Sequence, residues 1–280
     1  MGGVSASEAR TPLTYYGGKQ RLAAQIVSLM PPHRVYLEPF AGGAAVLFAK
    51  PRAPRETLND IDGQVMRFWR ALRDRQDELV AAIAATPYSR EEWNLCCERP
   101  DADDDIEAAR RFLVWIDQSF SREGTGWSPP SILFDRRGRW QAGVWANLPG
   151  KLAAAAHRLA GVALENGDAL ELIRRYDQAD AVIYCDPPYA GPWRLEPGKG
   201  YRYDQAERLW PDLVDVLSRV QHAAVILSGY PCDAVEELGW TRLDLVHKRS
   251  VTARSGSTLA DAPEAVWINP ALEASPRSLF

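Results

Sequence analysis

Four consecutive residues, Asp186-Pro187-Pro188-Tyr189, could together hold and activate a flat aromatic amine. Proline lacks an N–H and has a fixed φ, so the two prolines stiffen the backbone and leave carbonyls that only accept hydrogen bonds. The carboxylate of Asp186 and the carbonyl of Pro187 could accept both hydrogens of an exocyclic amine, and Tyr189 offers a stacking face. Holding both N–H groups would free the nitrogen lone pair for attack. For these residues alone, a plain proline turn after a strand is the alternative.

The elements that must position this motif begin with an apolar run at residues 181–185, which predicts a buried strand. Earlier in the chain, residues 34–40 predict another short strand, followed by Ala41-Gly42-Gly43 and a helical stretch at 44–49. A strand, a glycine turn and a helix let the backbone approach a nucleotide-like cofactor closely. The spacing differs from GxGxxG, which argues against NAD or FAD, and a tight turn remains the alternative.

A second short strand, Thr57-Leu58-Asn59, ends in Asp60. A carboxylate at the end of the second strand is placed to accept hydrogen bonds from ribose hydroxyls. Upstream, Tyr15-Tyr16-Gly17-Gly18-Lys19 is an aromatic and glycine turn that carries one lysine. Glu165-Asn166-Gly167-Asp168 follows a further strand candidate and is by itself an ordinary turn.

In this order, the motifs resemble the Dam-type DNA adenine-N6 methyltransferases, the D12 class or alpha group. Residues 264–270 are similar to the last strand of phage and prophage members, and the resemblance spans roughly residues 13–60 and 160–270. It implies transfer of a methyl group from S-adenosylmethionine to N6 of an adenine flipped out of double-stranded DNA. Catalysis would rest on positioning and hydrogen bonding, with no metal and no covalent enzyme intermediate.

The resemblance also assigns site residues. Asp186, Pro187, Pro188 and Tyr189 would form the catalytic motif, with Asp186 touching both cofactor and target base. The residues expected at the cofactor site are Tyr15, Gly18, Lys19, Glu38, Phe40, Gly42, Asp60, Asp168 and Asp186. One departure is Ala41-Gly42-Gly43, where the family often has Gly-x-Gly, and this affects the expected backbone contacts.

Two alternatives remain open. Cytosine-N4 methyltransferases use an electronically similar amine, but they mostly carry Ser where this chain has Asp186, which favours adenine. A non-catalytic DNA-binding relative is the other alternative, and Lys19, Asp60 and Asp186 argue against it.

The predicted fold class is α/β. Strand candidates at 34–38, 56–59, 162–165, 181–185 and 223–228 alternate with helical stretches that include 64–85 and 206–220, the latter with Asp204 as a plausible cap. This pattern predicts a parallel α/β sheet, and the resemblance implies that it is a doubly wound, Rossmann-like sheet of the class I methyltransferase type. By the resemblance, residues 242–247 and 265–269 would add a C-terminal antiparallel hairpin.

We expect two domains. Residues 1–75 and 158–280 would form the S-adenosylmethionine-dependent domain, and residues 76–157 an inserted, mostly helical target-recognition domain. Within the insert, an acidic turn occupies residues 101–105, Asp101-Ala102-Asp103-Asp104-Asp105. It favours the start of a helix over a metal site.

Arginine and lysine residues in four segments are candidates for DNA contacts, because such side chains hold phosphates and reach guanine edges. The expected DNA-binding residues are Arg122, Arg136, Arg137, Arg139, Lys199, Arg249 and Arg254. For the cluster at 136–139, a charged surface turn is the alternative.

Composition fits a protein of the cytoplasm, and the resemblance implies a bacterium or a phage-infected host. The chain has 280 residues and no apolar run of eighteen, and residues 1–10 lack the apolar core of a signal peptide. Its four cysteines have no metal-ligand spacing, so we expect reduced thiols. The net charge of -4 is unusual for a partner of double-stranded DNA, but a local basic face is what matters. We expect a monomer, with a dimer on DNA as the alternative.

Overall fold

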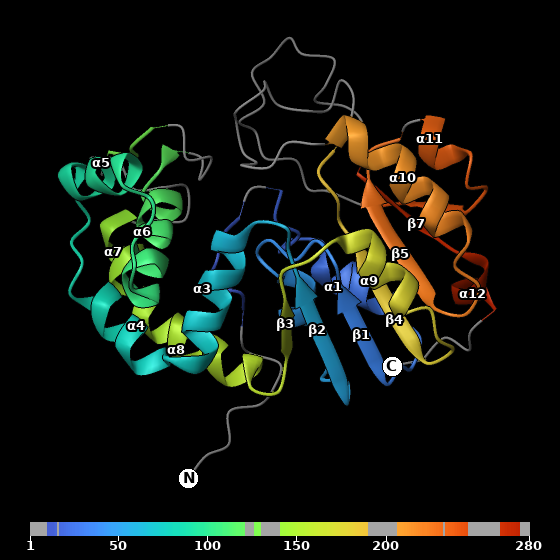
Figure 1. Ribbon diagram of the computed structural model, residues 1–280, viewed down its shortest axis with the longest axis horizontal. Coiled ribbons are helices and arrows are strands. Elements are labelled where there is room, and N and C mark those ends of the chain that lie inside the picture. Colours follow the sequence, from blue (N-terminus) through green and yellow to red (C-terminus); the bar gives the residue numbers. More distant parts are fainter. Residues whose placement is uncertain are drawn as a thin grey trace. The chain divides into compact units, whose positions relative to one another are not determined.

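The computed structural model describes residues 10–15, 17–120, 126–129, 141–189, 206–231, 233–245 and 264–274. The chain divides into two compact units, which are described separately (Figure 1). The helical unit comprises Met1–Gly18, Gly42–Pro51 and Asp62–Leu164. The sheet unit comprises Lys19–Ala41, Arg52–Ile61 and Glu165–Phe280.

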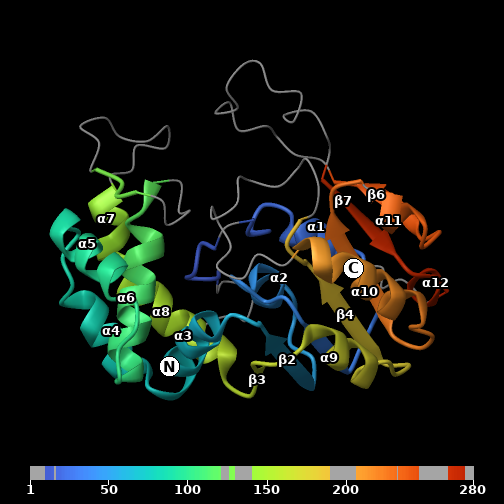
Figure 2. The same ribbon diagram turned by 45° about the horizontal axis from the view of Figure 1, so that its top comes forward.

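In the described part of the chain, the sheet has seven strands in the order β3-β2-β1-β4-β5-β7-β6. The strands are β1 (Val35–Glu38), β2 (Arg55–Asn59), β3 (Ala163–Glu165), β4 (Ala181–Cys185), β5 (Ala224–Gly229), β6 (Thr241–Asp244) and β7 (Ala265–Ile268). β1 pairs in parallel with β2 and β4, and β4 pairs in parallel with β5. β7 is antiparallel to both β5 and β6, so the last two strands form the predicted C-terminal antiparallel hairpin (Figure 2). The predicted fold class is thus confirmed.

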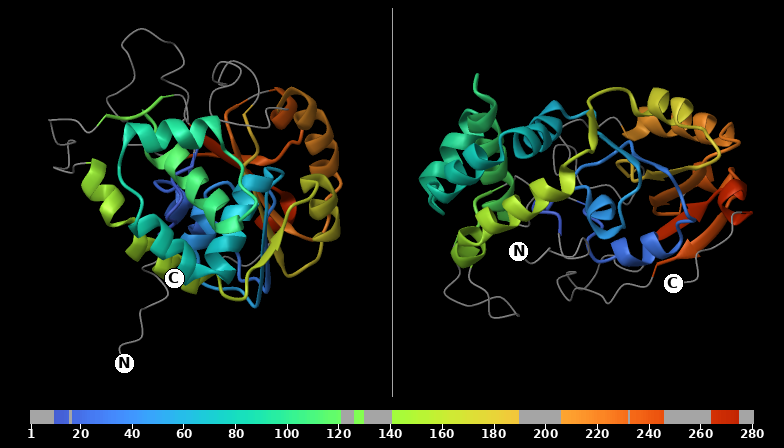
Figure 3. Two further views of the ribbon diagram at one scale, coloured as in Figure 1. Left: turned by 60° about the vertical axis from the view of Figure 1, so that its left-hand side comes forward. Right: turned by 90° about the horizontal axis from the view of Figure 1, so that it is seen from below.

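The central strands are apolar because helices cover the sheet on both faces. β4 is buried at every position, as expected of a parallel strand between two helical layers. α9 (Ala169–Arg175) and α10 (Ala206–Ser218) lie on one face, and α1 (Ala23–Ser28) lies on the other (Figure 3, right). Short helices α11 (Asp233–Glu236) and α12 (Pro270–Glu273) complete the described helices of this unit.

Successive strand residues point to opposite faces, and this alternation separates an apolar layer from a more polar one. Ile183 and Cys185 of β4 join the apolar core with Leu213 of α10 and Trp267 of β7. Tyr184, between them in β4, belongs to the opposite face. Asp186 is two residues after Tyr184, so its side chain is expected on the same face of the sheet as that of Tyr184.

The helical unit is built around aromatic packing. Its helices are α2 (Ala45–Ala49), α3 (Gly63–Asp74), α4 (Gln76–Ala84), α5 (Arg90–Glu98), α6 (Asp105–Asp117), α7 (Gln141–Ala146) and α8 (Leu148–Leu159). α3 packs against both α6 and α8. Phe68 lies between Trp69 and Phe112, with ring centroids 4.8 Å and 6.1 Å away. These buried rings supply much of the apolar surface that holds the unit together.

The helical pattern over residues 64–85 is not one continuous helix. Arg75 has φ -132° and ψ 44°, which ends α3, and α4 begins at the next residue. The Arg75 side chain is held by Glu78 at 2.6 Å and Asp104 at 2.9 Å. The break lets α3 and α4 each pack against α6, which periodicity alone does not encode. By contrast, the predicted helix start is confirmed, because Asp104 accepts a hydrogen bond from Glu107 N at 3.0 Å as the N-cap of α6.

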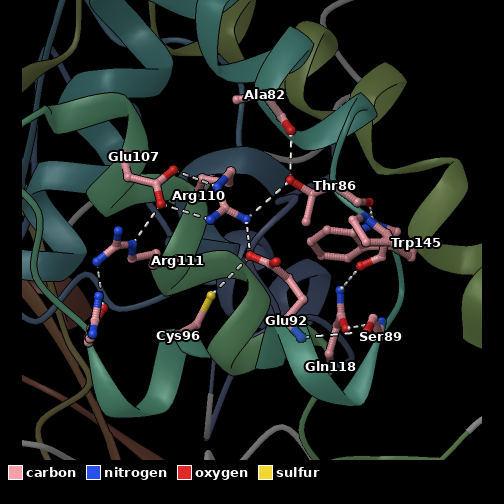
Figure 4. A network of polar contacts seen from close by, with 12 residues as sticks. Ala82, Thr86, Ser89, Glu92, Cys96, Glu107, Arg110, Arg111, Gln118 and Trp145 are labelled. Carbon is pink, nitrogen blue, oxygen red and sulfur yellow. Dashed lines mark hydrogen bonds and ion pairs between the residues drawn. The ribbon is translucent and has the colours of Figure 1, made fainter. Parts of the chain in front are cut away.

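A polar network centred on Arg110 ties three segments of the helical unit together (Figure 4). Its guanidinium contacts Glu107 of α6 at 2.6 Å, Glu92 of α5 at 2.5 Å and Thr86 after α4 at 3.3 Å. Trp145 of α7 donates to the carbonyl of Thr86 at 2.8 Å. Because Arg110 is largely buried, its charge is stabilised by the two carboxylates rather than by water.

The helical unit contains residues 76–157 together with α2, α3 and the chain up to Leu164, and the insert itself stays a prediction. None of the helices in the described ranges is both long and apolar enough to cross a membrane.

Candidate functional site

Asp186 directly follows β4 and is held by a buried lysine of the same unit. Lys19 Nζ lies 2.8 Å from Asp186 Oδ1, and the lysine side chain is only 4 % exposed while that of Asp186 is 18 % exposed. A buried charge needs a partner of opposite sign, and Lys19 and Asp186 provide this partner for each other. The structure thus brings together two of the residues predicted from separate motifs.

Glu264 is a third charged residue of this cluster, and its role was missed in the sequence. Lys19 Nζ lies 3.1 Å from Glu264 Oε1, and the Tyr189 hydroxyl donates to the same oxygen at 2.7 Å. Lys19 Nζ also lies 5.0 Å from the centroid of the Tyr189 ring, a cation–π contact. We call Lys19, Asp186, Tyr189 and Glu264 the lysine cluster. The only sequence signal for Glu264 was an acid immediately before a short apolar strand.

The lysine cluster changes the protonation of Asp186. Burial raises the pKa of Asp186 to about 6, Lys19 opposes this rise, and the nearby negative charge of Glu264 adds to it. The carboxylate is therefore ionised at neutral pH and able to accept hydrogen bonds, yet more basic than an exposed aspartate.

The backbone and ring of the motif are fixed by further contacts. Trp210 of α10 donates from Nε1 to the carbonyl of Pro188 at 2.9 Å. The Tyr189 ring meets Tyr230 edge to face, with centroids 4.9 Å apart and planes at 74°. Such T-shaped contacts are favourable for aromatic quadrupoles. Both the turn and its aromatic face are thus held by neighbouring elements of the sheet unit.

A second polar group joins the carboxyl ends of β1 and β2 to the turn that follows β3. Asn59 is fully buried at the end of β2 and donates from Nδ2 to the carbonyls of Pro39 at 2.9 Å and Gly167 at 3.1 Å. Gly167 N returns a hydrogen bond to Asn59 Oδ1 at 2.8 Å. Asn59 therefore supports the backbone beside Phe40, Asp60 and Asp168. An amide as the last residue of a buried strand was its only sequence signal.

The predicted cofactor residues of the sheet unit are close in sequence to the segments that Asn59 connects by hydrogen bonds. Asp60 is half-buried, and its carbonyl accepts from Asn166 Nδ2 at 2.7 Å. Asp168 is exposed and caps α9 by accepting from Leu170 N at 2.7 Å. Phe40 packs against the apolar core of the sheet.

Glu38, also predicted at the cofactor site, is buried at the end of β1. Its Oε2 accepts a hydrogen bond from the Tyr36 hydroxyl at 3.0 Å. Burial and the Glu38 charge together raise the pKa of Tyr36, so the phenol stays protonated and remains a donor.

Tyr15, Gly18 and Gly42 belong to the helical unit and pack on one another. A Cβ on Gly42, which has φ +43°, would lie 2.9 Å from Tyr15 Cδ1, and a Cβ on Gly18 would lie 2.9 Å from the Tyr15 carbonyl oxygen. Trp69 Nε1 also donates to the Gly42 carbonyl at 3.0 Å. Both glycines are therefore required by packing against Tyr15, independently of any bound cofactor.

All seven predicted DNA-binding residues lie outside the described residues: Arg122, Arg136, Arg137, Arg139, Lys199, Arg249 and Arg254. The described residues that flank Arg122 do form a short antiparallel pairing, with a bridge between Ser119 and Trp127. Gln118 accepts from Ser128 N at 2.8 Å through its backbone carbonyl. The guanidinium of Arg90 lies 4.7 Å from the Trp127 ring centroid.

Cys96, Cys97 and Cys185 are free thiols. Within the described ranges, no group of three or more His, Cys, Asp or Glu side chains could hold a metal ion.

The sheet order and the antiparallel hairpin are those of the predicted doubly wound fold, and the acid-Pro-Pro-Tyr turn directly follows β4. Residues 15–95 match the family described as D12 class N6 adenine-specific DNA methyltransferase. The resemblance predicted from the motifs is thereby confirmed.

Two similar proteins extend this comparison. A DNA N-6-adenine-methyltransferase of Escherichia phage P1 is 24% identical over 286 residues, which cover 94% of this chain and 36% of the relative. The chain thus spans about a third of the length of that relative. The structure of SMU.472, provisionally assigned as a methyltransferase and solved with SAH, aligns with a TM-score of 0.39 and 14% identity over 95% of this chain and 56% of that one.

Proposed function

We propose that this protein transfers a methyl group from S-adenosylmethionine to N6 of adenine in double-stranded DNA. The observation that carries the proposal is the position of Asp186, which is held by Lys19 at the end of β4, immediately before two prolines and Tyr189. The family match over residues 15–95 and the phage P1 relative support the same reaction.

In the proposed reaction, Asp186 accepts one hydrogen of the exocyclic amine and the Pro187 carbonyl accepts the other. Tyr189 stacks on the base, which must leave the duplex because an adenine in the stack does not reach this turn. As the amine nitrogen bonds to the methyl carbon, the carbon–sulfur bond breaks, and the nitrogen then loses a proton to water or to Asp186. A carboxylate with a pKa of about 6 is suited both to accept a hydrogen bond and to take that proton.

The residues around Asn59 fit the adenosine part of S-adenosylmethionine, which would supply the activated methyl group when bound. Asp60 offers a half-buried carboxylate at the end of the second strand, where a ribose diol needs an acceptor. Asp168 follows the turn after β3 and would accept from the adenine amine of the cofactor, and Phe40 offers an apolar surface. We assign DNA recognition to the insert at residues 76–157, which contains the candidate DNA-binding residues Arg122, Arg136, Arg137 and Arg139.

The proposal is tested by identifying the product. Purified protein is incubated with duplex DNA of mixed sequence and methyl-labelled S-adenosylmethionine, and the DNA is digested to nucleosides for mass spectrometry. N6-methyladenine is expected. Label in N4-methylcytosine would support the cytosine alternative, and absence of label from DNA with wild-type protein would reject the proposed reaction.

Asp60→Ala should weaken S-adenosylmethionine binding about tenfold to a hundredfold, because a hydrogen bond to a charged acceptor contributes roughly 1.5–3 kcal/mol. Calorimetric titration of the cofactor measures this directly, and DNA affinity without cofactor should stay nearly unchanged. Asp215→Ala, an exposed acid on α10, is the matched control. Equal cofactor affinity for Asp60→Ala and wild type would remove Asp60 from the site.

A further inference from the structure

Glu264 is held in place from both sides by strands of the sheet. Its carbonyl accepts a hydrogen bond from Leu245 N at 2.8 Å, and the next residue, Ala265, pairs with Gly229 of β5 and Asp244 of β6. The residue is 8 % exposed. A carboxylate in a mostly buried position needs polar partners, and Lys19 and Tyr189, both part of the lysine cluster, are two of them.

The two contacts of Glu264 reach the catalytic motif by different routes. Through Lys19 it shares one ammonium with Asp186, at 3.1 Å and 2.8 Å respectively. Through the Tyr189 hydroxyl, at 2.7 Å, it fixes the ring that would stack on the target base. Tyr230 supports the same ring from its edge. The contact with Lys19 affects the charge around Asp186, and the contact with the Tyr189 hydroxyl affects the orientation of the Tyr189 ring.

The charges of the lysine cluster do not cancel. Two carboxylates surround one ammonium, so the cluster carries a net negative charge in a largely buried place. The ionisable groups that interact with Asp186 include Lys19, Glu264, Cys185 and the three tyrosines Tyr184, Tyr189 and Tyr230. Among them Lys19 and the Tyr189 hydroxyl lower the pKa of Asp186, whereas Glu264 raises it. Glu264 therefore offsets part of the effect of Lys19.

We propose that Glu264 is a positioning residue of methyl transfer: it orients Tyr189 through the hydroxyl, and it competes with Asp186 for the Lys19 ammonium. This inference rests on the proposed function of the same site. Glu264 itself touches neither the target base nor the reacting atoms and acts through its two neighbours.

Two single substitutions separate these roles. Glu264→Gln removes the negative charge but keeps an oxygen that can accept from Tyr189, so it tests the charge. Tyr189→Phe removes the hydroxyl but keeps the ring and the charge, so it tests the orientation. Glu237→Gln, which removes a similar charge at an exposed position after α11, is the control.

The expected pH effect has a definite sign. Transfer requires ionised Asp186, so wild-type activity should fall as pH drops through about 6. Glu264→Gln removes a group that raises this pKa, so the acidic limb of kcat should move to lower pH by on the order of one unit. Tyr189→Phe should lower kcat several-fold and should move the limb to higher pH, the opposite direction, because the Tyr189 hydroxyl lowers the pKa of Asp186. Glu237→Gln should change neither kcat nor the limb.

A measurement without turnover separates this inference from the proposed function. The Asp186 carboxyl carbon is followed by NMR during a pH titration of the free protein, for wild type and for each variant. A lower midpoint in Glu264→Gln supports the inference, and an unchanged midpoint in a folded Glu264→Gln overturns it. If Glu264→Gln does not fold, wild-type kcat in Tyr189→Phe overturns the orienting role. Wild-type protein that titrates as expected but transfers no methyl group would reject the proposed function instead.

Discussion

Asp186→Ala should lower methyl transfer by at least about a hundredfold while leaving the protein folded. The substitution removes the acceptor that positions the amine and that can receive its proton. Lys19 keeps Glu264 as a partner at 3.1 Å, so the variant does not leave a buried ammonium without a carboxylate. Single-turnover methylation of duplex DNA at saturating cofactor measures the loss, and Asp244→Ala, an exposed acid of β6, is the control. Transfer near the wild-type rate in Asp186→Ala would reject the catalytic assignment.

Asp186→Asn separates catalysis from stability. The folded-state pKa of Asp186 is raised to about 6 from 3.8, so the folded protein binds this proton more tightly than the unfolded chain does. Between these two values, stability from this group falls as pH rises, and above about pH 6 the ionised carboxylate is destabilising. We therefore expect Asp186→Asn to unfold at a higher temperature than wild type at pH 8, with a gain on the order of 1–2 kcal/mol, although it transfers little methyl. A variant that is less stable at pH 8 and equally stable at pH 4 would contradict this sign.

The sequence predicts the central sheet because its strands are buried on both faces. Runs such as residues 181–185 are apolar without interruption, and this is typical of parallel strands between helical layers. The acid-Pro-Pro-Tyr motif and Lys19 were also recognisable, because the residue types alone suggest the chemistry. Local pattern and local chemistry were sufficient for these features.

Features that depend on contacts distant in sequence were not predictable in the same way. Glu264 meets Lys19 and Tyr189 only because β7 inserts beside β5, a pairing that no local motif encodes. The break at Arg75 arises because two helical segments each pack on α6. In both cases tertiary packing decides the outcome, whereas the local pattern is compatible with several arrangements.

Asn59 is another residue whose contacts are distant in sequence, and these contacts support the backbone next to the predicted cofactor residues. Its amide makes three hydrogen bonds, two to the carbonyls of Pro39 and Gly167 and one from Gly167 N, all within a fully buried position. These bonds connect the ends of β1 and β2 to the turn after β3, where the predicted cofactor residues lie. Without the Asn59 hydrogen bonds, the ends of β1 and β2 are no longer connected to the turn after β3. The stability of the protein and its affinity for the cofactor should therefore fall together.

Asn59→Ala should lower the free energy of unfolding by about 3–5 kcal/mol, because each buried group left without a partner costs roughly 1–3 kcal/mol. At temperatures where the variant is folded, S-adenosylmethionine should bind at least about tenfold more weakly. Urea unfolding and cofactor calorimetry measure the two effects. Asn166→Ala is the matched control, because the Asn166 amide also bonds to a loop carbonyl, that of Asp60, but at an exposed position. The free energy of unfolding of this variant should fall by less than about 1 kcal/mol.

Asn59→Asp distinguishes the hydrogen bonds from simple filling of space. The aspartate keeps the size of the side chain and can still accept from Gly167 N, but it replaces the two N–H donors by oxygen lone pairs facing the carbonyls of Pro39 and Gly167. We therefore expect Asn59→Asp to be at least as destabilising as Asn59→Ala at pH 7. If Asn59→Asp instead retains wild-type stability and cofactor affinity, the amide only fills a cavity, and the connection between the three chain segments is not what holds the cofactor edge together.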